Sequence, residues 1–228
     1  MSLKNIIKSR EKRKNHFTWN NIQVFIKDPI TNQEVNIKSV LSTIGEKVPQ
    51  HLLRNVEMIY VGKFDFFKER EIQAMYENSS IFVTCDQDSE EDMCDDIIHE
   101  IAHSVEELHR QDIYADGDLE KEFKQKRQKL YMTLKGEGLP VNLDSFNDCT
   151  YKKEFDEYLH KDIGYPMLNM VSADIFYSPY AITSLREYFA NGFEAFFYYG
   201  DYDFVRRSCP QLFNKLSMLM EKGYDQEY

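Results

Sequence analysis

The sequence predicts an α+β fold, in which a small mixed or antiparallel sheet packs on one amphipathic helix and a mainly helical C-terminal half follows. Three β-rich runs, IQVFI, VEMIYVG and IFVT, lie before residue 85. A long helical pattern follows in DDIIHEIAHSVEEL, and helical spacing returns in SLREYFANGFEAFF and PQLFNKLSMLM. The period of two in strands and of about 3.6 residues in helices separates the two classes.

The first half is expected to hold the sheet. NNIQVFIKDPITNQEVNI predicts two short strands around a turn, and VEMIYVG predicts an interior strand. Between them, SVLSTIGEKVPQHLLRN predicts one or two short helices broken at Gly45 and Pro49. KFDFFKERE is expected to be a charged loop before the β-rich run at residues 81–84.

Helices are expected to dominate the rest of the chain. An acidic cluster favours a helix start because negative charge there complements the helix dipole; it comprises Asp88, Glu90, Glu91 and Asp92. DLEKEFKQKRQKLYMTLKGEG predicts a charged amphipathic helix ending at Gly136 or Gly138. Residues 139–181 are expected to be irregular with one short helix near KKEFDEYLHK, and two more helices close at Gly200 and Gly223.

Length and composition limit the possible classes of protein. With 228 residues and 42% hydrophobic content, the chain predicts one folded domain at residues 21–228 after a basic, mobile extension at residues 1–20. The net charge of -11 argues against a nucleic-acid partner. No apolar run predicts a membrane span and no signal peptide is visible, so a cytoplasmic protein, or one released by a non-classical or host-delivered route, is expected.

HEIAH, residues 99–103, predicts a metal-binding helix. His99 and His103 stand four residues apart, about 40° around a helix, so both imidazoles can hold one ion. Glu100 points about 100° away from His99, within reach of a water on that ion. An apolar stripe leaves these three side chains off the core-facing side; it comprises Cys94, Ile97, Ile98, Ile101, Val105 and Leu108. The alternative is a fortuitous, solvated histidine pair.

A catalytic zinc ion needs a third protein ligand and an open fourth position. His109 has the spacing of the HExxHxxGxxH motif of metzincins, but Glu106 replaces the glycine that lets the chain turn, so His109 should lie on the wrong face of a continuing helix. Glu187 is a second candidate, although Ser184 and Glu187 also match a capping box. Glu194, two turns further along, competes with Glu187.

HEIAHSVEEL and REYFANGF together resemble the catalytic domain of anthrax lethal factor and its relatives, which include the secreted Pro-Pro endopeptidases of clostridia. The likeness covers roughly residues 50–228 and is weaker at CPQLFNKLSMLM. It implies a zincin-like fold in which His99, His103 and Glu187 bind zinc and Glu100 is the general base.

The same resemblance assigns roles to three further parts of the chain. Tyr180, seven residues before Glu187, would support the oxyanion or the leaving group, with Tyr177 as its rival. SSIFVT would be either an edge strand that pairs with an extended peptide or an ordinary interior strand. The interval between His103 and Glu187 is longer than the family leads us to expect, and an insertion at residues 142–168 would alter the substrate cleft more than the metal site.

The sequence therefore predicts a zinc-dependent endopeptidase that acts on a peptide or protein substrate in extended conformation. Glu100 would accept a proton from a Zn²⁺-activated water, and Tyr180 would help to stabilise the oxyanion. Two alternatives remain open. One is a non-catalytic peptide- or protein-binding module that keeps the fold, and the other is a metzincin-like peptidase that uses His109 as its third ligand.

Overall fold

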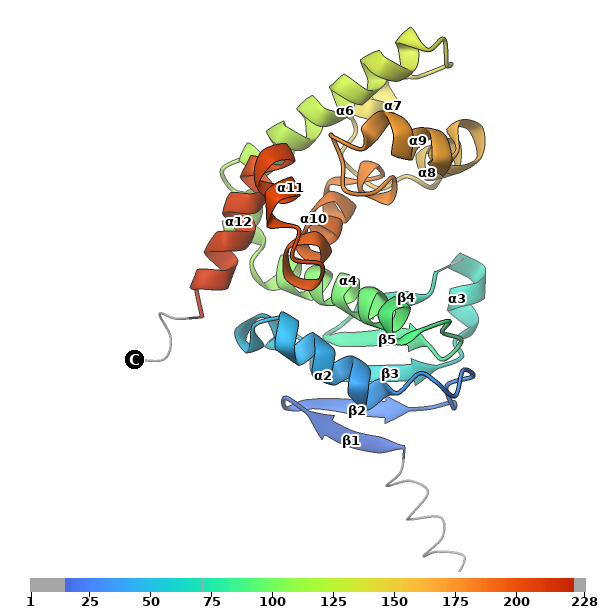
Figure 1. Ribbon diagram of the computed structural model, residues 1–228, viewed down its shortest axis with the longest axis vertical. Coiled ribbons are helices and arrows are strands. Elements are labelled where there is room, and N and C mark those ends of the chain that lie inside the picture. The colour runs from blue at the N-terminus through green and yellow to red at the C-terminus, as the bar shows by residue number, and fades with distance from the viewer. Residues whose placement is uncertain (1–14, 71, 224–228) are drawn as a thin grey trace, which may run out of the picture. The chain divides into compact units, whose positions relative to one another are not determined.

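The computed structural model describes residues 15–70 and 72–223, and it divides the chain into two compact units, Met1–Val105 and Glu106–Tyr228. The fold is α+β, with one five-stranded mixed sheet and mostly helical content (Figure 1). The division falls inside one helix, α4 (Glu90–Leu108), so no Gly-, Ser- or Pro-rich linker marks it in the sequence. The sequence had predicted a single domain at residues 21–228 and placed no boundary there.

The first unit is built on the sheet, whose strand order is β1-β2-β3-β5-β4. The strands are β1 (His16–Trp19), β2 (Ile22–Ile26), β3 (Met58–Gly62), β4 (Ala74–Glu77) and β5 (Ser80–Thr84). β2, β3 and β5 run parallel, whereas β1 and β4 pair antiparallel with their neighbours. The two hairpins turn at Asn20-Asn21 and Asn78-Ser79, where all four residues have positive φ, the conformation that tight two-residue turns require.

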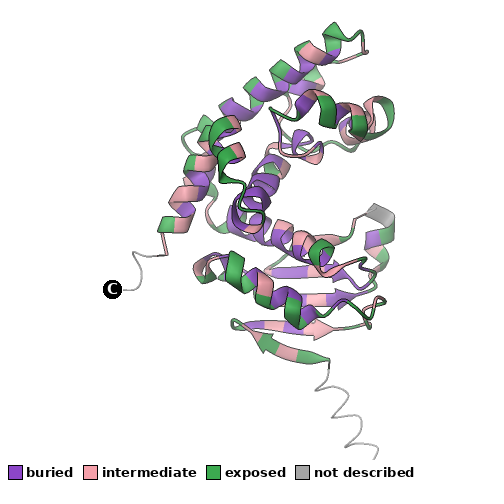
Figure 2. Cartoon of the chain, viewed as in Figure 1, coloured by how far each residue is buried: buried purple, intermediate pink, exposed green. Residues whose placement is uncertain are grey.

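Two helices cover one face of this sheet, α2 (Ile37–Lys47) and α4 (Figure 1). The alternate residues of the three parallel strands that face them are almost fully buried; they are Ile22, Val24, Ile59, Val61, Ile81 and Val83. The Cys94 thiol of α4 donates to the Val40 carbonyl of α2, so the two helices also contact each other. Figure 2 shows the resulting buried layer along β3 and β5.

The opposite face carries a row of aromatic rings along the strand register. His16, Phe25, Tyr60 and Phe82 stack in succession, with ring centroids 4.5, 5.1 and 5.2 Å apart. A short helix, α3 (Asp65–Arg70), lies at the end of this row, where Phe66 meets Phe82 edge to face at 5.8 Å. Stacked cross-strand rings stabilise a sheet face that no long helix covers.

Several local expectations need correction in the first unit. β1 falls within residues 1–20, the predicted mobile extension, of which residues 1–14 lie outside the described residues. Only one strand forms in NNIQVFIKDPITNQEVNI, because its second half leads into α2, and Gly45 does not break that helix. KFDFFKERE contains α3 rather than a loop, because three phenylalanines at its start pack on one another and on Phe82. Of the two readings of SSIFVT, the interior strand is the one that forms, as β5, and its neighbour β4 lies at an edge of the sheet.

The second unit is helical. Its helices are α5 (Arg110–Tyr114), α6 (Asp118–Gly136), α7 (Leu143–Asn147), α8 (Lys153–Glu157), α9 (Tyr165–Ser172), α10 (Leu185–Phe193), α11 (Tyr202–Ser208) and α12 (Pro210–Glu221). Wider turns occur at η2 (Tyr158–Ile163) and η4 (Glu194–Tyr198), and a single tight turn at η3 (Tyr180–Ile182). No described helix is long and apolar enough to cross a membrane.

A buried carboxylate joins three of these helices. Glu122 of α6 accepts the Tyr188 hydroxyl of α10 at 2.8 Å and the backbone N–H groups of Gln211 and Leu212 at 2.7 and 3.2 Å. The two amides belong to the first turn of α12, so Glu122 caps that helix from a neighbouring one.

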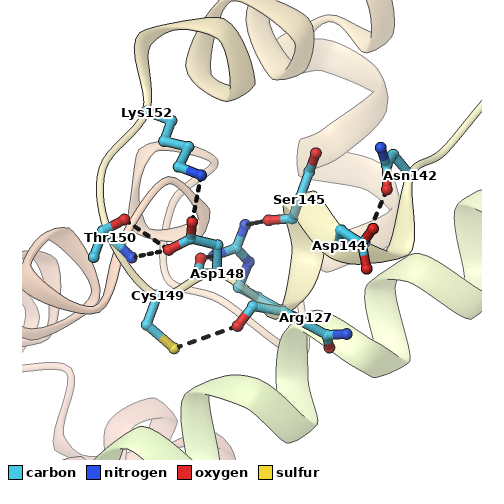
Figure 3. A network of polar contacts seen from close by, with 9 residues as sticks. Arg127, Asn142, Asp144, Ser145, Asp148, Cys149, Thr150 and Lys152 are labelled. Carbon is cyan, nitrogen blue, oxygen red and sulfur yellow. Dashed lines mark hydrogen bonds and ion pairs between the residues drawn. The ribbon is translucent and has the colours of Figure 1, made fainter.

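Residues 142–168 are more ordered than the sequence predicts, because a buried arginine binds their backbone (Figure 3). Arg127 of α6 is fully buried and donates to the carbonyls of Ser145 and Asp148. Its guanidinium also lies 4.4 Å from the ring centroid of Phe155 in α8. Asp148 in turn pairs with Lys152 at 2.5 Å, which closes the loop between α7 and α8. The sequence predicted one short helix here, but it shows neither the arginine's partners nor the additional short helices.

Candidate metal centre

The two histidines of HEIAH lie side by side on α4, as their spacing predicts. The ring centroids of His99 and His103 are 4.9 Å apart, and the rings are nearly perpendicular, at 82°. Adjacent turns of one helix hold both rings, so the pair can supply two nitrogen ligands without any movement of the backbone.

The carboxylate between them is bound to the edge of the sheet. Glu100 accepts the backbone N–H of Tyr76 in β4 at 2.5 Å. The Tyr76 hydroxyl accepts from Asn55, whose amide also donates to the Ser104 carbonyl one turn further along α4. Tyr76 is therefore linked to α4 through both its backbone and its side chain, and this fixes β4 beside Glu100.

A second acid lies one turn before Glu100. Burial raises the pKa of Asp96 to about 6, against a hydrogen bond from Gln87 at 2.8 Å that lowers it. The charges of Asp95 and Glu100 raise this pKa further, whereas His99 lowers it. Negative charge is thus concentrated on the part of α4 that carries the histidines, which favours a bound cation.

Glu187 lies in the first turn of α10. Ser184 is the N-cap of this helix, and its hydroxyl oxygen accepts the Glu187 N–H at 3.2 Å. The serine half of the predicted capping box is therefore present, and it engages the backbone of Glu187. The neighbouring Leu185 N–H donates to the Cys149 carbonyl at 2.9 Å, which attaches the loop after α7 to the same turn.

His99, His103 and Glu187 form a group that can hold a metal ion. Each residue offers one ligand atom, and these atoms lie within 4.8 Å of one another. Among the described residues neither His109 nor Glu194 joins such a group. Two imidazoles and one carboxylate are a donor set that suits zinc and leaves a fourth position for water or substrate.

The two rival ligands lie elsewhere in the second unit. Leu108 was predicted to belong to the buried stripe but is 51% exposed. The predicted continuation of the helix through His109 is also wrong, because α4 ends at Leu108. His109 is instead the N-cap residue of α5 and lies 3.4 Å from the Asp112 carboxylate. Glu194 is buried at the start of η4. The prediction that it lies two turns beyond Glu187 assumed a continuous α-helix, but α10 ends at Phe193.

The charge of Glu187 influences the pKa of Tyr180, one of the two candidate tyrosines. Burial is the main cause that raises the pKa of Tyr180 well above its usual value, and the charge of Glu187 is the second. The ring of Tyr177 packs instead near Phe204 and Tyr199, at centroid distances of 5.5 and 6.1 Å. Tyr180 therefore remains a protonated phenol at neutral pH and can donate a hydrogen bond.

Residues from the 142–168 segment also surround Glu187, and sequence reasoning did not identify them. The Tyr151 hydroxyl donates to Asp156 at 2.9 Å. Burial, that hydrogen bond and the charges of Asp156 and Glu187 raise the pKa of Tyr151. Electrostatic interactions with Asp156 and Tyr165 also raise the pKa of Tyr180. The only sequence signal was the tyrosine content of this segment, which does not specify a location.

The comparisons with known proteins find no match to this chain among protein-family models, curated proteins or solved structures.

Proposed function

We propose that the chain is a zinc-dependent endopeptidase, with His99, His103 and Glu187 as ligands and Glu100 as general base. The observation that carries the proposal is the grouping of these three ligand atoms within 4.8 Å around an HExxH helix. The resemblance to the lethal factor-like zincins supports the same assignment, because it selects the same three residues.

Zinc bound there would lower the pKa of a bound water to near 7 and polarise the scissile carbonyl. Glu100 accepts the proton of the attacking water and passes it to the leaving amine. The N–H of Tyr76, 2.5 Å from the carboxylate, holds Glu100 in one orientation. Tyr180 donates a hydrogen bond to the oxyanion, a role that its raised pKa permits because the phenol stays protonated.

The proposed substrate is a peptide or protein in extended conformation. β4 is one of the two edge strands of the sheet, and Tyr76 within it binds the proposed base. An extended chain that pairs with this edge would bring its backbone close to Glu100. We therefore propose for β4 the peptide-pairing role that one reading of the sequence gave to SSIFVT.

Glu100→Gln separates the catalytic proposal from the alternative of a non-catalytic module. The variant keeps a hydrogen-bond acceptor and both histidines, so it should bind zinc like the wild type yet lose about 100-fold or more in peptide cleavage. Zinc content is measured by elemental analysis after purification without chelator, and cleavage by mass spectrometry of a digested peptide library. Glu91→Gln, on the exposed side of the same helix, is the control.

The possible outcomes differ clearly. Equal cleavage by the Glu100→Gln variant and the wild type would exclude Glu100 as the base. A wild-type chain that binds zinc but cuts nothing in the library would favour the binding module. Loss of zinc binding in His109→Ala but not in Glu187→Ala would favour the metzincin-like alternative.

A further inference from the structure

A buried carboxylate lies at the C-terminal end of α4 and is not part of the proposed chemistry. Glu106 is 7% exposed and accepts two hydrogen bonds, from Arg186 Nε at 2.9 Å and from the Tyr114 hydroxyl at 3.0 Å. The next residue, Glu107, is exposed. Two adjacent glutamates of the same helix therefore lie in opposite environments, and only the first is bound to other elements.

The two donors to Glu106 are a guanidinium and a phenol. Burial raises the pKa of Tyr114, and so do the charge of Glu106 and the hydrogen bond to it. Burial lowers the pKa of Arg186, but the hydrogen bond to Glu106 and the charges of Glu106 and Glu187 outweigh this and raise it. A buried glutamate side chain that accepts from a guanidinium and a phenol is a geometrically defined contact between α4, α5 and α10.

The position of this contact in the chain links it to the proposed ligands. Arg186 directly precedes Glu187 in the first turn of α10. Glu106 follows His103 by three residues, about one turn, on the same continuous helix. The ion pair therefore connects the turn that carries Glu187 to a residue one helical turn after His103.

We propose that Glu106 and Arg186 are positioning residues that set the Glu187 carboxylate against the histidine pair, with Tyr114 orienting Glu106. The inference rests on the proposed function, because it requires Glu187 to be a metal ligand. Glu187 is separated from His103 by 83 intervening residues, so its placement depends on contacts between helices rather than on local spacing. Metal ligands must be held within about 0.5 Å of their productive positions, and contacts that orient them change metal affinity by about 10- to 100-fold.

Zinc affinity, measured by competition with a chromophoric chelator, tests the inference. Glu106→Gln should weaken zinc binding about 10- to 100-fold. Glu107→Gln is the matched control and should bind like the wild type, because its side chain is exposed. Arg186→Met should resemble Glu106→Gln, and the double variant should lose no more than either single variant, because both remove the same ion pair.

Two further measurements distinguish positioning from a general loss of stability. Arg186→Lys should keep most of the zinc affinity that Arg186→Met loses, since a single donor atom of Arg186, Nε, is bonded to Glu106. In cobalt-substituted protein, Glu106→Gln should change the visible absorption bands, which report the ligand geometry, while Glu107→Gln leaves them unchanged. A merely structural pair would lower the thermal midpoint without altering these bands.

The outcomes also separate this inference from the proposed function. Glu106→Gln with wild-type zinc affinity and an unchanged cobalt spectrum would overturn the positioning role alone. A wild-type chain that binds no zinc, or binds it equally well as His103→Ala, would overturn the proposed metal site and this inference with it.

Discussion

Replacing Glu122 with glutamine should destabilise the helical unit strongly. One oxygen of Glu122 accepts both the Tyr188 hydroxyl and the Leu212 N–H, and the other accepts the Gln211 N–H at 2.7 Å. A glutamine can keep the first pair through its carbonyl oxygen, but its NH₂ then faces the Gln211 N–H, donor against donor. Hydrogen bonds to charged groups contribute about 1.5 to 3 kcal/mol each, and neutral ones about half as much. Losing one bond and weakening two by half predicts a cost of about 3 to 6 kcal/mol.

Urea unfolding followed by far-UV circular dichroism measures this cost. The midpoint should fall by at least about 1 M, because the slope is about 1 to 3 kcal/mol per molar urea. Glu120→Gln on the same helix is the control: Glu120 forms an exposed pair with Lys124, so its loss should cost no more than about 0.5 kcal/mol. Equal midpoints for the two variants would refute the idea that Glu122 holds α12 to α6.

Two further predictions concern the pH dependence of stability and the packing of α10. Because the pKa of Asp96 is raised from 3.8 to about 6, the folded state binds more protons than the unfolded state in this interval, so stability should fall by about 3 kcal/mol as pH rises through it. Asp96→Asn should remove that decline in zinc-free protein, and an unchanged slope in urea unfolding across this range would contradict the assignment. A Cβ at Gly192 would lie 2.1 Å from Leu212 Cδ2, so Gly192→Ala should cost about 1 to 3 kcal/mol. Adding Leu212→Ala should recover part of that loss in the same assay, whereas purely additive costs would mean that the two side chains do not clash.

The local features of the site could be predicted from the sequence because they depend on helix geometry alone. The spacing of His99 and His103 places their rings on adjacent turns, and the acids from Glu90 onward mark the helix start where α4 begins. The strands β2, β3 and β5 were likewise recognisable, because alternating or continuous apolar runs are a local signal.

Features that depend on distant partners could not be derived in this way. Nothing in HFTW indicates a strand until it pairs with β2, and the helix in KFDFFKERE depends on rings that pack on Phe82 in β5. The helical pattern of the downstream segment offered both Glu187 and Glu194 as ligands, and only the family resemblance selected Glu187. In the sequence, Arg127 cannot be distinguished from the other charged residues of a predicted amphipathic helix. In the structure its side chain is buried and donates to the backbone of Ser145 in α7.

Glu106 shows how one residue can be interpreted differently in the sequence and in the fold. In the sequence, Glu106 stands where the metzincin motif has a glycine, and this argued against His109 as a metal ligand. In the structure it has partners of its own, Arg186 and Tyr114, and α4 ends two residues later. Along α4, Glu90 accepts hydrogen bonds from α2, Glu100 from β4 and Glu106 from α5 and α10. Glu90 and Glu100 hold α4 to elements of the first unit, and Glu106 holds its last turn to elements of the second unit. Ligands on a helix with fixed partners are what a preorganised metal site would require.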